Sequence, residues 1–314
     1  MTLAVALGAA VIATAHYRSN MNRMPALALV SGLTAAAIAL VLSGCSTTGI
    51  TRAPARLGAS FTHIHEVVVG DQDGSLLVAT HEGLYQLQVE AEGSAALGGP
   101  VGGLDFDLMG FTIAADSAYA SGHPGPATPA SFGGPNLGLV TSADLGQTWR
   151  SVSRKGETDF HALAVMTAVD GVPHVFGLDP GAPRLQRSTD GGLTWSGGAD
   201  LVARDILVVD TTVYATTSEG VAVSVDDGMS FTLDSGAPAL FLIAADHQNG
   251  FAGVDTTGTV WTRSPGRDWV AGGTVTGTPQ ALAVDGASIY VADDRGIAVT
   301  EDGGATWIVL EVNG

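Results

Sequence analysis

An eight-residue phrase recurs four times in this chain, and its spacing limits the folds that the chain can adopt. The copies read SADLGQTW at 142–149, STDGGLTW at 188–195, SVDDGMSF at 224–231 and TEDGGATW at 300–307. Successive copies are 46, 36 and 76 positions apart. Because 76 is twice 38, the spacing predicts a degenerate copy near residue 264, and TRSPGRDW at 262–269 has the expected Gly266 and Trp269. Such a period is typical of a fold built from repeated structural units.

The stretch before each copy has the same order of short β-rich runs and turns. In the last stretch the runs are ALAVDG at 281–286, IYVADDRG at 289–296, IAVTEDGG at 297–304 and TWIVL at 306–310. Runs of this kind, separated by Asp/Gly turns, predict four antiparallel strands, a to d, in each unit. Six units begin near His65, Met109, His161, Asp205, Phe241 and Gln280. With no helical pattern between them, they predict an all-β fold, a β-propeller over residues 60–314, with six blades, or seven if the interval 83–138 holds another.

The repeated octet has the residue types of a tight turn between strands c and d. Its aspartate can accept hydrogen bonds from backbone N–H groups across the turn, and its glycine can adopt a positive φ. The tryptophan that ends the octet begins strand d and can pack between blades. We therefore predict a structural role for Asp144, Asp190, Asp226 and Asp302, and for Trp149, Trp195, Trp269 and Trp307.

The first 45 residues have the composition of an export signal. They contain no Asp or Glu, Arg23 precedes an apolar run over 26–42, and the run ends in small residues before Cys45. A basic start, a short apolar stretch and small residues predict a signal sequence, with Met21 or Met24 as the true start. The alternative is an uncleaved membrane anchor. Residues 46–59, rich in Ser, Thr, Pro and Arg, predict a flexible tether.

Charge argues against one class of partner. The chain has 31 acidic residues against 13 basic ones, and Lys155 is its only lysine. No basic stripe exists on which a phosphate backbone could bind, so the sequence predicts no nucleic-acid partner. Cys45 is the only cysteine, which excludes an internal disulfide.

Three stretches resemble known families. Leu42-Ser43-Gly44-Cys45 resembles the lipobox of bacterial lipoproteins, which implies that Cys45 is lipidated and that the chain is held on the extracytoplasmic side of a cell membrane. The octet resembles the Asp box of BNR/Asp-box propellers, a group that includes bacterial sialidases, the sortilin ectodomain and photosystem assembly factors. HIHEVVV, VATHEGLYQL, DLMGFTI, SGHPG and DFHALAV resemble the glycosylhydrolase-like Asp-box lipoproteins. The resemblance implies a propeller but not one activity, because such folds carry different functions.

Strand order assigns the loops of a propeller to its two faces. The octets lie between strands c and d, on the same face as the a–b turns. The b–c loops and the starts of strands a lie on the opposite face, around the mouth of the central channel. Because ligands bind at concave sites, we expect the b–c face to be the binding face.

Histidines and acids gather at this predicted mouth. Aligning the six units places His81, His123, Asp179, Ser218, Asp255 and Asp294 at one position of the b–c loops, and His63, Asp107 and Asp159 two residues before strands a. The expected ligand-binding residues are His63, His65, His81, His123, His161, Asp179, Asp255, Asp294 and Gln280. The alternative is that the loop aspartates cap turns and that the histidines are satisfied locally.

A divalent metal at the channel mouth is the one cofactor that the sequence suggests. Two histidines with a carboxylate suit a transition metal, and His63, His65 and His161 are the candidate ligands. A compact ligand motif such as HExxH is missing from the sequence.

Sialidase chemistry does not fit these residues. Sialidases use three arginines, a Tyr–Glu pair and an Asp, with a Tyr/Phe-Arg-Ile-Pro motif, whereas the nearest string here is Arg52-Ala53-Pro54 in the tether. Another glycoside hydrolase needs only two carboxyl groups, for which Asp107, Asp159 and Asp205 are candidates. The sequence therefore favours an extracytoplasmic module that binds a glycan or a protein, with glycoside hydrolysis as the first alternative and a scaffolding role as the second.

Overall fold

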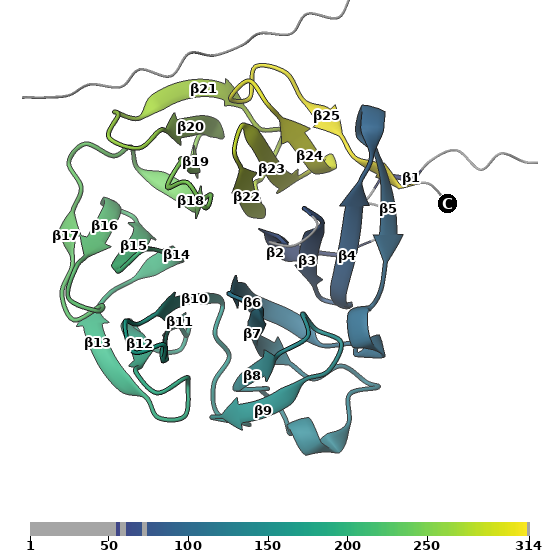
Figure 1. Ribbon diagram of the computed structural model, residues 1–314, viewed down its shortest axis with the longest axis vertical. Helices are drawn as coiled ribbons and strands as arrows, with labels where there is room; N and C mark the ends of the chain where they lie inside the picture. The colour runs from purple at the N-terminus through teal and green to yellow at the C-terminus, as the bar shows by residue number, and fades with distance from the viewer. Residues whose placement is uncertain (1–54, 57–60, 71–73, 313–314) are drawn as a thin grey trace, which may run out of the picture. The chain divides into compact units, whose positions relative to one another are not determined.

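The chain forms a ring of six β-sheets around a central channel. The computed structural model describes residues 55–56, 61–70 and 74–312, which belong to the compact unit Thr51–Gly314. Within them, consecutive strands form consecutive blades that follow one another around the ring (Figure 1). The predicted six-bladed all-β propeller is confirmed. The predicted signal sequence, Cys45 and most of the predicted tether lie outside the described residues.

Each blade contains four antiparallel strands that follow one another in chain order. The first of them, strand a, lies against the channel. Blades 1 to 3 are β2 Ile64–Val69, β3 Leu76–Thr80, β4 Gly83–Val89 and β5 Ser94–Gly98; β6 Asp107–Ala114, β7 Ser117–His123, β8 Leu139–Ser142 and β9 Arg150–Ser153; and β10 Ala162–Thr167, β11 Pro173–Leu178, β12 Arg184–Ser188 and β13 Ser196–Asp200. Blades 4 to 6 are β14 Ala203–Val209, β15 Thr212–Thr217, β16 Gly220–Ser224 and β17 Thr232–Leu233; β18 Leu240–Ala245, β19 Phe251–Asp255, β20 Thr259–Arg263 and β21 Val270–Thr274; and β22 Ala281–Asp285, β23 Ser288–Asp293, β24 Gly296–Thr300 and β25 Ile308–Val309.

The long interval over 83–138 contains no seventh blade. It holds the two outer strands of blade 1, strands β6 and β7 of blade 2 and a long b–c loop with the 3₁₀ turn η4 Ala130–Phe132. Two further 3₁₀ turns, η2 Ala91–Gly93 and η3 Val101–Gly103, flank β5. Within the described residues, no helix is long and apolar enough to span a membrane.

The two ends of the described chain meet at the rim of blade 1. Strand β26, Glu311–Val312, pairs in parallel with β5, and the short strand β1, Ala55–Arg56, pairs with β26. Leu310 is fully buried just before β26, in a cluster with Ile64 of blade 1 and Ile297 of blade 6. The ring is therefore closed both by backbone pairing and by a shared apolar core.

The core of the molecule consists of the seams between neighbouring blades. Strand alternation gives each sheet two apolar faces, and each face packs on the next blade. Leu84 of blade 1 packs with Phe106 and Phe111 of blade 2, and Leu139 of blade 2 packs with Phe160 of blade 3. The tryptophans of the octets extend these seams: the rings of Trp195 and Phe160 lie 4.7 Å apart. Trp149, Trp269 and Trp307 pack in the same way, each in a different seam.

The four octets form one type of turn between strands c and d. In the second copy, Asp190 accepts hydrogen bonds from the Thr194 N–H at 2.8 Å, the Thr194 hydroxyl at 2.5 Å and the Ser188 hydroxyl at 2.7 Å. The Gly192 N–H donates to Ser188 Oγ at 2.9 Å. Asp144, Asp226 and Asp302 accept corresponding bonds in their own turns.

The degenerate copy at 262–269 shows what the turn requires. The fourth and fifth residues of the intact octets have positive φ, as in Gly191 and Gly192 at 72° and 87°. Pro265 occupies the fourth place in the degenerate copy, and its ring fixes its own φ at about −65°. The turn of blade 5 therefore lacks the positive φ at the fourth place, although the Arg267 N–H still bonds the Ser264 carbonyl, as the Gln147 N–H bonds the Asp144 carbonyl in the first octet.

Candidate functional site

β-Bulges at the channel mouth determine which side chains face it. The register of strand a shifts at His65 in β2, Met109 in β6, Arg204 in β14 and Phe241 in β18. Sequence alignment places Asp205 at the position of His65, and the structure corrects this by one residue. Arg204 is the bulged residue of blade 4, whereas Asp205 corresponds to Glu66 of blade 1, because each follows the bulge and pairs with the last but one residue of strand b. A bulge inserts a residue that period-two alternation does not show.

Two histidines and an aspartate from blades 1 and 2 converge at the mouth. His65 is the bulged residue of β2, His81 lies in the b–c loop of blade 1, and Asp107 begins β6. Asp107 Oδ1 lies 2.7 Å from His81 Nδ1 and 3.3 Å from His65 Nε2. The two ring nitrogens are 3.3 Å apart. These three residues, which we call the first triad, therefore direct three potential ligand atoms at one point.

His63 packs against the imidazoles of the first triad. Its ring centroid lies 4.6 Å from that of His65, edge to face, and 5.6 Å from that of His81. Burial lowers the pKa of His63, and the neighbouring His65 and His81 lower it further. Burial alone would raise the pKa of Asp107, but hydrogen bonds from His65 and His81 outweigh it and hold that pKa below its ordinary value.

A second group of the same composition lies one blade further on. Asp159 Oδ2 is 2.8 Å from His161 Nε2 and 3.1 Å from His123 Nε2, and we call these three residues the second triad. The triads are adjacent, because Asp107 of the first pairs with His123 of the second across β6 and β7. Asp159 Oδ1 is buried and has no hydrogen-bond partner among the described residues. The second triad thus keeps one acceptor unused.

The remaining candidates serve local structure in different degrees. Gln280 Oε1 accepts a hydrogen bond from the Ile64 N–H at 3.0 Å and so ties blade 6 to blade 1. Asp255 accepts bonds from the N–H groups of Thr257 and Thr259 inside its own loop, and Asp294 accepts one from the Thr278 N–H. Asp179 also caps its loop, through the Gly181 N–H.

A pocket of about 390 Å³ spans the mouth from blade 1 to blade 4. Its polar lining comprises His63, His65, His161, Asp179 and Arg204. Its apolar lining comprises Met109, Leu178, Pro180, Ala182, Pro183, Leu201, Val202 and Ala203. The Arg204 guanidinium lies 5.1 Å from the centre of the Phe241 ring, an interaction between a cation and an aromatic face that orients it at the rim. Of the nine expected binding residues, His63, His65, His161 and Asp179 line this pocket, whereas five do not: His81, His123, Asp255, Asp294 and Gln280.

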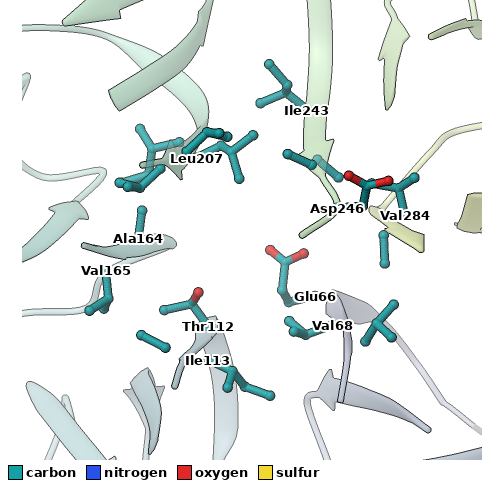
Figure 2. A pocket seen from close by; sticks show the side chains of 18 of the residues that line it. Glu66, Val68, Thr112, Ile113, Ala164, Val165, Leu207, Ile243, Asp246 and Val284 are labelled. Atoms are coloured by element: carbon teal, nitrogen blue, oxygen red, sulfur yellow. The ribbon is translucent and has the colours of Figure 1, made fainter. Parts of the chain in front are cut away.

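The channel below the mouth is lined by Glu66 and Asp205, and by Asp210 and Asp246. Innermost strands of all six blades line a cavity of about 460 Å³, and Figure 2 shows Glu66 pointing into it among aliphatic side chains. Glu66 and Asp205 belong to blades 1 and 4, which stand opposite each other in the ring (Figure 1). Burial raises the pKa of Glu66 well above its ordinary value, and the charge of Asp205 raises it further. Burial raises the pKa of Asp205 to about 6, although the Ile243 N–H donates to it at 3.0 Å.

Sequence reasoning missed Glu66, and it placed Arg204 near the mouth without counting it among the binding residues. The signal for Glu66 is an acid inside the β-branched run IHEVVV. An acid among apolar neighbours is costly to bury, so its presence in such a strand indicates a role other than packing. Arg204 was left out of the binding residues because the alignment gave its position in strand a to Asp205. The three catalytic candidates do not form one group: Asp107 and Asp159 belong to the two triads, and Asp205 lines the channel.

Comparison with known proteins establishes the fold. No family model matches the chain, and no curated protein matches it by sequence. A chain of a nidogen–laminin complex matches with TM-score 0.54 and 15% identity, over 73% of this chain and 89% of that one. The GH74 xyloglucanase of Xanthomonas campestris matches with TM-score 0.50 and 17% identity, over 82% and 46%.

PorZ of Porphyromonas gingivalis, a bacterial surface component of the type-IX secretion system, is also similar to the chain in structure. It matches with TM-score 0.50 and 15% identity, over 78% of this chain and 32% of PorZ. The chain thus spans less than half the length of the xyloglucanase and of PorZ. At these identities the likeness extends to the propeller fold, and the activities named are those of the other proteins.

Proposed function

We propose that this chain is an exported propeller that binds a glycan at the mouth of its channel. The observation that carries the proposal is the lining of the mouth pocket, where imidazoles and a guanidinium face an apolar wall. Sugar rings present hydroxyl groups at their edges and C–H groups on their faces, so a glycan site needs both kinds of surface. A volume of about 390 Å³ lies within the range of small-molecule sites.

Two side chains are placed to contact such a ligand directly. His161 lines the pocket with a side chain that is 36% exposed, so its ring is accessible although Nε2 bonds Asp159. Arg204 lines the pocket from the neighbouring blade 4 and is exposed. An arginine with five donors in a fixed plane suits vicinal hydroxyl groups or a sugar carboxylate.

A glycan array screened with the purified chain tests the proposal. We expect binding to a restricted set of glycans, and loss of that binding in the double variant His161→Ala/Arg204→Ala. A chain that binds no glycan on the array but captures a defined extracytoplasmic protein through the same two residues would replace the glycan by a protein partner.

A second candidate function is glycoside hydrolysis inside the channel. It is favoured by Glu66 and Asp205, which line one channel from opposite blades, since a carboxyl group with a raised pKa in a site with a second carboxyl group is the pattern of a general acid. Chromogenic glycosides distinguish the two functions. Turnover that disappears in Asp205→Asn would establish hydrolysis, whereas binding without turnover supports the first proposal.

We also propose that the chain is lipidated on Cys45 and held at the extracytoplasmic side of a cell membrane. The lipobox-like Leu42-Ser43-Gly44-Cys45 and the apolar run before it support this. In cells that process lipoproteins, we expect Cys45→Ser to move the chain from the membrane fraction to the soluble fraction.

A further inference from the structure

The first triad has the geometry of a metal site. In a tetrahedral zinc site with metal–ligand bonds of about 2.0–2.1 Å, the ligand atoms lie about 3.3–3.4 Å apart. His65 Nε2 is 3.3 Å from His81 Nδ1 and 3.3 Å from Asp107 Oδ1. His81 Nδ1 and Asp107 Oδ1 are 2.7 Å apart, so of the three distances only this one must increase when an ion binds. Among the described residues, this is the one group of three such side chains whose ligand atoms all lie within 4.8 Å of one another.

The surroundings of the triad favour a fixed site with an open position. His65 is 8% exposed, and the ring of His63 packs on it edge to face, which restricts its rotation. His81 is 40% exposed, so an ion held there can be reached from solvent at the mouth. Two of the ligands stand on strands of different blades, and ligands on rigid elements keep their geometry better than ligands on loops.

We propose that His65, His81 and Asp107 bind one divalent transition-metal ion, with zinc as the reference ion. Two imidazoles and a single carboxylate select zinc or a neighbouring first-row metal over calcium and magnesium, which take oxygen ligands. The net charge of −18 attracts cations to the surface in general but does not choose this place. The three converging ligand atoms determine where the ion binds. The site shares His65 with the lining of the mouth pocket, but it includes neither His161 nor Arg204, the two residues that test glycan binding.

Calorimetric titration of the chelator-treated chain with zinc chloride tests the proposal. We expect one equivalent of Zn²⁺ to bind and Ca²⁺ to give no binding. His81→Ala and Asp107→Asn should each weaken zinc binding by about 10-fold or more, because even residues that only orient metal ligands contribute about 10- to 100-fold. Cobalt substitution gives a second readout: the visible absorption of four- or five-coordinate Co²⁺ should appear in the unaltered chain and be lost in Asp107→Asn.

A matched control distinguishes zinc binding at the first triad from zinc binding by any exposed histidine. His174 bonds Asp227 at 2.9 Å on the octet face, without a second histidine, so His174→Ala should titrate as the unaltered chain does. Circular dichroism of each variant without metal verifies that it is folded.

Two results would overturn the proposal. The first is an unaltered chain that binds zinc no more tightly than folded His81→Ala and Asp107→Asn. The second is a zinc equivalent that His123→Ala abolishes and Asp107→Asn leaves intact, because it would move the ion to the second triad.

Discussion

Asp190 shows how one side chain can fix a turn. It accepts three hydrogen bonds within its octet. These bonds lower its pKa to about 2, and the bond from the Thr194 hydroxyl has the largest effect. We expect Asp190→Ala to lower the Tm by on the order of 2–6 °C, because the Thr194 N–H and two hydroxyl groups lose their acceptor. Asp200→Ala is the control in the same blade: its carboxylate is 79% exposed and pairs only with Arg184, and a pair of this kind contributes little. Equal thermal melts of the two variants would contradict the turn's role.

Asp205 is a residue whose negative charge destabilises the fold. Its pKa rises from 3.8 when unfolded to about 6 in the channel, so its contribution to stability is present at low pH and is lost as the pH rises through about 6. We expect Asp205→Asn to raise the free energy of unfolding by on the order of 1–3 kcal/mol at about pH 7.5, and by much less near about pH 4. Urea unfolding at both pH values measures this. Asp210→Asn, at the exposed end of the same strand, is the control, and a stabilisation by Asp205→Asn that does not vary with pH would refute the cause given.

The elements that the sequence predicts well are those whose chemistry is local. The octets need only their own Asp, Gly and Ser or Thr to form, so their recurrence predicts a repeated sheet and the face on which the turns lie, and the strand pattern brings the number of units to six. The bulges are different, because the chain alternates normally on both sides of His65 and Arg204 and only pairing with strand b reveals the extra residue. The convergence of His81 with Asp107 depends on the seam between two blades, and no spacing in the sequence encodes that distance.

Ring closure is the element-level feature that most affects stability. Leu310 is fully buried between blades 6 and 1, just before β26 pairs with β5. We expect Leu310→Ala to lower the free energy of unfolding by about 2–5 kcal/mol, through lost apolar burial and the cavity left at the closing seam. Ile308 lies two residues earlier and is 53% exposed, so Ile308→Ala should cost under about 1 kcal/mol. Urea unfolding compares the two, and a smaller effect at Leu310 than at Ile308 would show that the seam does not close the ring.

At the scale of the whole molecule, the two faces of the ring differ in chemistry. On the octet face Asp144, Asp190, Asp226 and Asp302 are satisfied by their own loops, and His174 and Arg187 of blade 3 pair with Asp227 of blade 4. The b–c face brings side chains from different blades together in two triads and a pocket. The groups at the mouth differ in that they lie beside a pocket lined by blades 1 to 4, and this is why we propose binding at the mouth.

The most direct test of this account compares one arginine on each face. A glycan that the array identifies is titrated calorimetrically into the unaltered chain, into Arg204→Ala at the mouth and into Arg150→Ala, an exposed arginine beside the first octet. The account predicts that Arg204→Ala weakens binding by about 10-fold or more, the effect of losing one charged hydrogen bond of about 1.5–3 kcal/mol, and that Arg150→Ala leaves it unchanged. Unchanged affinity in Arg204→Ala together with a loss in Arg150→Ala would place the ligand on the octet face and contradict the account.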